Sequence, residues 1–210
     1  MKNSLRMAPV LLTMLPAAAI AGQVEMGTGP ANKIVDTLGA SVAIVSNDAG
    51  KGSDFDTALR FNGYVQKQVS PNLSVQFGLS QSTDAEDSNE DNTGKYKLSI
   101  SHSDVFGGLK FVANPEDDFS LFARGGLMYY YSQIKLEESF FGLKDAGIDK
   151  EIEEGTGFYL GGGVAFDLAP DMQCELEVTY LQRNDYFDKS PRSFDFKETG
   201  ITLGVVYRLP

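Results

Sequence analysis

The chain has 210 residues, of which 18 are basic and 29 acidic, with one His, one Cys and no Trp. The net charge of −11 argues against a nucleic-acid partner, because phosphates are neutralised by a basic face. A single Cys excludes an internal disulfide and a multi-cysteine metal site, and we expect neither a metal nor a cofactor.

The first 21 residues have the layout of a secretory signal peptide. Lys2 and Arg6 form a basic start, an apolar run follows, and Ala19-Ile20-Ala21 fits the small-x-small cleavage rule. The run is too short to cross a bilayer as a helix. We therefore predict a cleaved signal peptide at 1–21 and one domain at 22–210, which keeps 16 basic against 29 acidic residues. A buried N-terminal helix is the alternative.

Apolar and polar residues alternate through the rest of the chain, which is typical of β-strands with two different faces. Phe158 and Leu160, for example, share one face of their segment, while Gly161 and Gly163 share the other. The pattern predicts eight strands, at 33–46, 57–69, 73–83, 95–112, 119–135, 155–168, 172–184 and 198–209. In the fourth strand the apolar positions change parity, so we expect a bulge or bend near 101–104.

The connections between the predicted strands alternate in length. Three are short and contain Pro with Asn or Asp, as tight turns require, at 70–72, 114–118 and 169–171. Four are longer and polar, at 47–56, 84–94, 136–154 and 185–197. Short turns at one end and long loops at the other are the pattern of outer-membrane barrels, with the long loops outside the cell.

Charged residues in mid-strand favour a membrane barrel over a secreted β-sandwich, which is the main alternative. If lipid covers the apolar face, the charges point into the lumen, and the narrow interior of an eight-stranded barrel accounts for the glycines on the same face. Because a buried charge needs a partner, we favour a neutralised plug over a gated pore. The predicted network consists of Arg60, Lys110, Arg124, Asp167, Glu175, Glu177 and Arg208, with Lys110, Arg124 and Arg208 facing Glu175 and Glu177.

Two segments carry a family resemblance. GTGFYLGGGVAFDLAPDMQCELEVTYLQ (155–182) and the terminal TGITLGVVYRL resemble the penultimate hairpin and the closing strand of small outer-membrane barrels of the OmpA/OmpX type, also called porin-family barrels. The resemblance implies an all-β, eight-stranded antiparallel up-and-down transmembrane β-barrel in the outer membrane of a Gram-negative bacterium. It also implies outer-membrane lipid, lipopolysaccharide and the barrel-assembly machinery as partners.

His102, the only imidazole, has Ser101, Ser103 and Asp104 as neighbours, which raises the hypothesis of a lipid A-modifying enzyme. Adjacent residues on a strand point to opposite faces, however, whereas a catalytic triad must converge within hydrogen-bond reach. We therefore name no catalytic residue and expect a solvated His102 in the outer part of the fourth strand.

Two of the predicted external loops contain candidate binding groups. The acidic stretch 84–91 is of a kind that suits Ca²⁺ or Mg²⁺, but its spacing does not match an EF-hand, and we expect a solvated loop. In the third loop, Phe140, Phe141 and Leu143 are candidates for binding another surface. A patch folded over the barrel mouth is the alternative.

These observations lead to one functional expectation and two alternatives. We expect an outer-membrane surface barrel whose long acidic external loops mediate adhesion, colonisation or envelope integrity, with a ligand on a host or another cell surface. A narrow channel for small solutes is the first alternative, and a lipid A-modifying outer-membrane enzyme is the second.

Overall fold

The computed structural model describes residues 34–49, 55–90, 94–115, 118–140, 147–186 and 194–210, so the predicted signal peptide at 1–21 lies outside the described residues. Within these ranges no helix is long and apolar enough to cross a membrane. The strands are β1 (Thr37–Asp48), β2 (Ala58–Ser70), β3 (Leu73–Ser82), β4 (Ala85–Glu90), β5 (Gly94–Ala113), β6 (Phe119–Phe140), β7 (Gly147–Ala169), β8 (Met172–Tyr186) and β9 (Phe194–Arg208).

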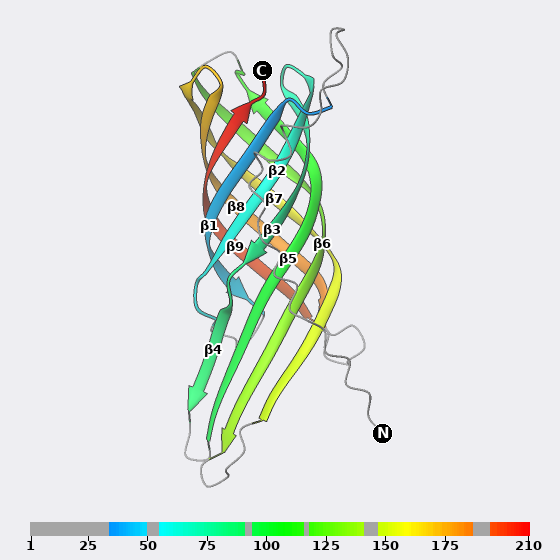
Figure 1. Cartoon of the computed structure of the whole chain (residues 1–210), viewed down its shortest axis with the longest axis vertical. Helices are drawn as coiled ribbons and strands as arrows, with labels where there is room; N and C mark the ends of the chain where they lie inside the picture. Colours follow the sequence, from blue (N-terminus) through cyan, green and yellow to red (C-terminus); the bar gives the residue numbers. More distant parts are fainter. Residues whose placement is uncertain (1–33, 50–54, 91–93, 116–117, 141–146, 187–193) are drawn as a thin grey trace. The chain divides into compact units, whose positions relative to one another are not determined.

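The strands form one antiparallel sheet that closes on itself (Figure 1). Closure comes from the pairing of β1 with β9 and of β3 with β5. Because β3 and β4 both pair with β5, one after the other, they share a single position in the ring, interrupted at Thr83–Asp84. The ring therefore has eight positions, and the predicted eight-stranded antiparallel barrel is confirmed. Closure also gives each of the eight ring positions two neighbours, which backbone groups in lipid require.

The outer surface of the barrel carries an apolar band. On β6, Phe119, Leu121, Leu127 and Tyr129 are exposed, whereas the alternate residues Ser120, Phe122, Met128 and Tyr130 are buried. Phe119 and Tyr129 are ten residues apart, which corresponds to about 26 Å along the barrel axis for a strand tilted by about 40°. This height matches the band of about 25 Å between two aromatic girdles that outer-membrane barrels present to lipid.

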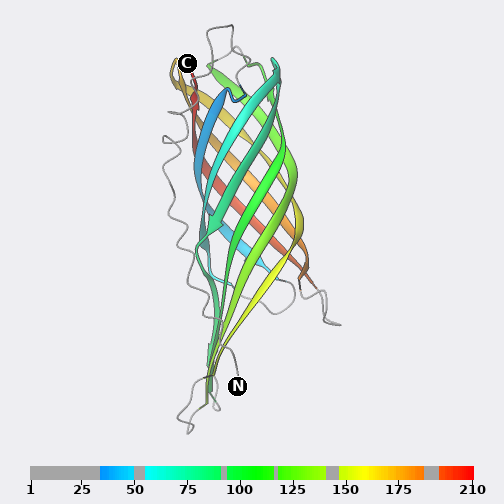
Figure 2. The ribbon, with the colours of Figure 1, turned by 45° about the vertical axis from the view of Figure 1, so that its right-hand side comes forward.

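Two of the four predicted long loops are largely strand. The predicted loop 84–94 contains β4, and β6 and β7 both continue into the predicted loop 136–154. We call the part beyond the exposed Tyr131 the extension; it comprises 85–90, 94–102, 132–140 and 147–154. Its far part forms a single layer beyond the barrel (Figures 1 and 2), while its near part contributes buried residues to the barrel mouth. Its strands are joined by polar cross-strand pairs such as Lys97 with Glu86, and alternation of apolar residues does not reveal these.

The predicted bulge near 101–104 is wrong. β5 pairs with β6 without a register shift, from Gly94 opposite Phe140 to Ala113 opposite Leu121. The parity of the apolar residues changes because the surroundings of the strand change. Val105 faces lipid, whereas Ile100, only 2% exposed, points inward into an apolar cluster at the mouth of the barrel.

Candidate functional site

The barrel interior holds two layers of ion pairs. In the layer nearer the short turns, the Lys110 ammonium donates to Glu175, which also accepts a hydrogen bond of 3.1 Å from the Tyr64 hydroxyl. Arg124 binds Glu177 with two donors, Nε at 2.6 Å and Nη2. The four strands that supply these side chains present them because alternate residues point into the lumen.

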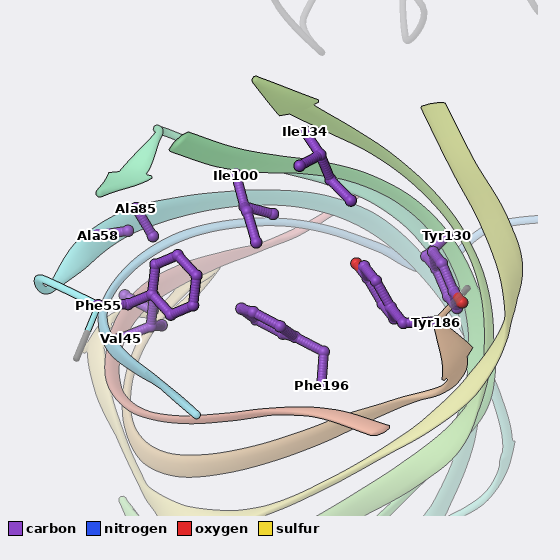
Figure 3. Packing of buried hydrophobic residues seen from close by; sticks show 10 residues of the cluster. Val45, Phe55, Ala58, Ala85, Ile100, Tyr130, Ile134, Tyr186 and Phe196 are labelled. Carbon is purple, nitrogen blue, oxygen red and sulfur yellow. The ribbon is translucent and has the colours of Figure 1, made fainter. Parts of the chain in front are cut away.

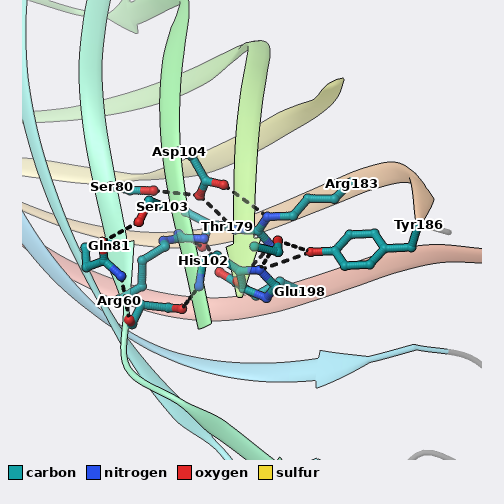
Figure 4. Close-up of polar contacts among 12 residues, drawn as sticks. Arg60, Ser80, Gln81, His102, Ser103, Asp104, Thr179, Arg183, Tyr186 and Glu198 are labelled. Carbon is teal, nitrogen blue, oxygen red and sulfur yellow. Dashed lines mark hydrogen bonds and ion pairs between the residues drawn. The ribbon is translucent and has the colours of Figure 1, made fainter. Parts of the chain in front are cut away.

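The second layer lies nearer the extension and is centred on Arg183 (Figure 4). Its Nε and Nη2 donate to the two oxygens of Asp104 at 3.1 and 2.7 Å, and its Nη1 donates to Glu198 at 3.2 Å. Glu198 also accepts from Arg60, whose Nη2 donates to Thr179 at 3.1 Å. Both carboxylates and both guanidiniums in this layer are at most 4% exposed at the side chain.

The charges of the two layers cancel. Four cations, Arg60, Lys110, Arg124 and Arg183, are paired with four anions, Asp104, Glu175, Glu177 and Glu198. Such a balanced set attracts a passing ion only weakly, because each fixed charge is already neutralised by a hydrogen-bonded partner. The arrangement acts chemically as a polar plug.

Two glycines allow the interior to be this crowded. A Cβ at Gly161 would lie 1.8 Å from Glu177 Oε1, so the side chain of Glu177 occupies the space above that glycine. A Cβ at Gly126 would lie 2.1 Å from the carbonyl oxygen of Gly107, so β5 and β6 could not keep their present separation. Only Gly lets a charged side chain or a backbone come this close.

A small cavity of about 30 Å³ remains between the layers, with Arg60, Arg124 and Tyr159 in its lining. Among the residues that the structure describes, Arg60 Nε and the Tyr159 hydroxyl have no hydrogen-bond partner. A cavity of this size and polarity suits one or two ordered water molecules, and it is far too small for an organic substrate.

An aromatic cluster closes the lumen on the extension side (Figure 3). Tyr186 and Phe196 are fully buried, Tyr130 stacks on Tyr186 with ring centroids 5.0 Å apart, and Phe55 packs against Phe196. We call the buried cluster Ala43, Val45, Phe55, Ala58, Ala85, Ile100, Tyr130, Ile134, Tyr186 and Phe196 the cap.

His102 lies against the cap and is 1% exposed, so the predicted solvated histidine is wrong. Its Nδ1 lies 2.8 Å from Ser132 Oγ and 3.1 Å from the Tyr186 hydroxyl, and its ring lies 4.8 Å from that of Phe196. The regular strand, without the expected bulge, turns His102 inward. Ser132 and His102 thus form a serine–histidine contact, but Ser132 is completely buried.

The structure brings together five of the seven predicted network residues, Arg60, Lys110, Arg124, Glu175 and Glu177. The other two do not join them. Arg208 pairs with Asp167 at 3.0 Å on the rim near the short turns, where the Arg208 side chain is 44% exposed. The predicted pairing of Arg208 with Glu175 or Glu177 is therefore wrong, because residue parity gives the face of a strand but not the depth along it.

The residues predicted to bind another surface in the third loop, Phe140, Phe141 and Leu143, lie at or beyond the end of β6. Phe141 and Leu143 lie outside the described residues, and Phe140 is the last residue of β6. Within the ranges that the structure describes, no group of three or more His, Cys, Asp or Glu side chains is arranged to hold a metal ion.

Sequence reasoning missed three network residues, Asp104, Arg183 and Glu198. Glu198 and Arg183 share the parity of the polar face on their strands, and this signal was available in the sequence. Asp104 was hidden by the expected bulge, since a regular strand places it on the same face as Lys110.

Comparisons with known proteins agree with this architecture. The family model "Outer membrane protein beta-barrel domain" matches residues 7–208, whereas no curated protein sequence matches the chain. Among solved structures, Neisserial surface protein A has a TM-score of 0.52 at 10% identity, with 82% of this chain and 96% of that chain covered. Ail, the attachment invasion locus protein of Yersinia pestis, has a TM-score of 0.50 at 18% identity, with 84% and 100% covered.

A third similar structure is the outer membrane protease OmpT from Escherichia coli, with a TM-score of 0.50 at 10% identity and 83% and 94% of the two chains covered. At such identities the likeness shows the fold alone, since one fold carries many functions.

Proposed function

Since the chain belongs to the family of outer-membrane proteins with a β-barrel domain, we propose that it is a closed barrel that displays its extension on the cell surface for attachment. The outer-membrane location follows from the family and from the apolar band of the barrel. The attachment role is the part that requires a test.

One observation carries the proposal, namely that the polar interior is filled while the strands continue outside. The two ionic layers and the cap fill the described part of the lumen, and the cavity between the layers has a volume of about 30 Å³. Beyond Tyr131, in contrast, β6 adds nine more residues, which is up to about 30 Å of strand outside the membrane. A protein that only filled the membrane would have no need of this structure, and long external segments are where binding residues concentrate in such folds.

The similar structures support this role without deciding it. Two of them are, by their names, a surface protein and an attachment invasion locus protein, and one is a protease. The serine–histidine contact of this chain lies under the cap with Ser132 fully buried, so a substrate on the cell surface has no path to it. We therefore place attachment ahead of both catalysis and solute transport.

The experiment compares cells that carry the intact chain with cells that carry a trimmed variant. In the variant, residues 87–98 and 136–149 are each replaced by Asn-Gly, a two-residue hairpin turn that joins the strands in their present register. We expect the intact chain to raise attachment to epithelial cells or matrix-coated plates, and the trimmed chain to lose this gain. Equal amounts of heat-modifiable protein in the outer-membrane fraction are the control, and undiminished attachment by the trimmed variant contradicts the proposal.

A further inference from the structure

The two faces of the extension differ in charge. Strand register places four lysines, Lys95, Lys97, Lys135 and Lys150, on the outer face, which continues the lipid-facing side of the barrel. Four glutamates share that face, and the structure pairs Lys95 with Glu90 at 2.6 Å, Lys97 with Glu86 at 2.7 Å and Lys135 with Glu137. The fourth, Glu154, lies beside Tyr131 and hydrogen-bonds Tyr129. The outer face is therefore electrically balanced.

The inner face, which continues the lumen side, carries only negative charge. The same register places Asp87, Glu138, Glu151 and Glu153 on it. Among the described side chains of these four strands, neither Lys nor Arg in the extension lies on this face. The charge difference comes from strand parity, because all four lysines occupy outward positions.

An apolar stripe runs along the middle of the inner face. Leu98 and Leu136 are paired neighbours on β5 and β6 and are half-buried, and Tyr96 beside them is 40% exposed. Asp87 on β4 lies next to Leu98 on one side. On the other side, Glu151 on β7 lies opposite Ile134, one inward position nearer the barrel than Leu136. The face thus consists of apolar residues between two acidic margins.

The dimensions of this face suit a helix. β4 and β7 are three strand spacings apart, so the acidic margins are separated by about 14 Å, while a helix with its side chains is about 10–12 Å across. Outside the cap, the face runs from Gly94 to Leu98 on β5, which is four residue spacings or about 14 Å, and this equals the length of about nine helical residues.

We propose that the inner face of the extension binds a cationic amphipathic helical segment of another protein. Apolar side chains of the helix lie on Leu98, Leu136 and Tyr96, and its lysines or arginines face Asp87 and Glu151 on the two margins. Charge complementarity selects this partner, because an acidic helix or a sulfated polysaccharide is repelled by a face that carries carboxylates and no cation. The inference rests on the proposed attachment function and specifies the partner for it.

The test measures binding of a fluorescent 14-residue helical peptide, with leucine on one face and lysine on the other, to the full chain refolded in an uncharged detergent. The inner-face variant is Asp87→Asn/Glu138→Gln/Glu151→Gln, and the matched outer-face variant is Glu86→Gln/Glu137→Gln/Glu154→Gln. Both variants remove three negative charges, so they lower the long-range attraction of the peptide equally. Peptide that binds to the detergent is also the same for both, and the difference between the variants therefore reports binding at the inner face.

We expect the inner-face variant to weaken peptide binding about tenfold or more, and the outer-face variant by less than about threefold. Leu136→Ser should weaken binding, whereas Ile152→Ser on the outer face should not. Equal loss in both charge variants, or a peptide that binds neither the wild-type chain nor any variant above the level of empty detergent, overturns the inference. A shift in mobility on boiling shows that each variant is folded.

The same variants separate this inference from the proposed function. If trimming the extension abolishes cell attachment while the inner-face variant attaches as well as the wild type, the cationic partner is wrong and the attachment function stands. If trimming leaves attachment intact, the attachment function is wrong, and a site-specific peptide interaction would then serve another role.

Discussion

Arg183 is the side chain on which the second ionic layer depends most. It is completely buried, donates to Asp104 at 3.1 and 2.7 Å and donates to Glu198 at 3.2 Å. Arg183→Met keeps an apolar stem of similar length but leaves Asp104 without its cation and gives the lumen one excess negative charge. Removing one partner of a buried ion pair costs about 3–5 kcal/mol, and we expect a loss of that order in the free energy of unfolding.

Urea unfolding in lipid vesicles, followed by tyrosine fluorescence and by mobility before boiling, measures this loss. Arg208→Met is the matched control, because Arg208 forms an exposed pair with Asp167 and such pairs contribute about 0–1 kcal/mol. Adding Asp104→Asn to Arg183→Met restores a neutral lumen with three cations and three anions. The double variant should therefore recover about 1 kcal/mol or more relative to Arg183→Met alone.

Two results would contradict the role of Arg183 in balancing the charge of the lumen. Arg183→Met could prove no more destabilising than Arg208→Met, which would mean that the buried network contributes no more than a surface pair. Alternatively, Asp104→Asn could add a further loss to the Arg183→Met variant, which would mean that charge balance does not govern the stability of the lumen.

Three more predictions follow from the geometry. Gly126→Ala should lower the free energy of unfolding by about 1–3 kcal/mol, because its Cβ would lie 2.1 Å from Gly107 O. The Cβ of Gly107→Ala would meet no atom nearer than 3.8 Å, so this variant should leave the free energy of unfolding nearly unchanged in the same urea assay. Val178 lies at the middle of the lipid-facing band and is 60% exposed. Val178→Arg should lower the free energy of unfolding by about 2–4 kcal/mol, while Val69→Arg beside a short turn should lower it by about 0–1 kcal/mol. Equal losses would contradict the placement of the band. The hydrogen bond from Lys135 lowers the pKa of the Glu137 carboxyl in the extension. The pair therefore stabilises the fold at neutral pH and loses this effect as the pH falls through the folded pKa. Lys135→Met should raise the pKa of Glu137 in a carboxyl NMR titration, and an unchanged titration would show that the pair does not form in solution.

The sequence predicts the barrel well because lipid and lumen impose opposite chemistry on alternate residues. Where one face is apolar and the other polar, as between Phe119 and Tyr129, the alternation gives both the strand and its orientation. The same reasoning correctly places Lys110 opposite Glu175 in the lumen, because both occupy polar-face positions near the short turns.

The prediction fails where this contrast ends. Both faces of the extension carry charged residues, so its strands look like polar loops in the sequence. On β5 the apolar side changes from lipid at Val105 to the cap at Ile100, and this change resembles a bulge although the strand is regular. That misinterpretation hides Asp104 and, with it, the partner of Arg183. Parity also gives no depth along the strand, so it predicts a network position for Arg208, whose side chain lies instead on the rim.

A closed lumen distinguishes a barrel that acts through its extension from a solute channel. Planar-bilayer recording of the purified, folded chain tests whether the lumen is closed. Because four buried cations are paired with four buried anions and the cap covers the mouth, we expect no steady single-channel steps above the bare bilayer. Regular, sustained steps from the wild-type chain would contradict the closed lumen and would favour a solute channel.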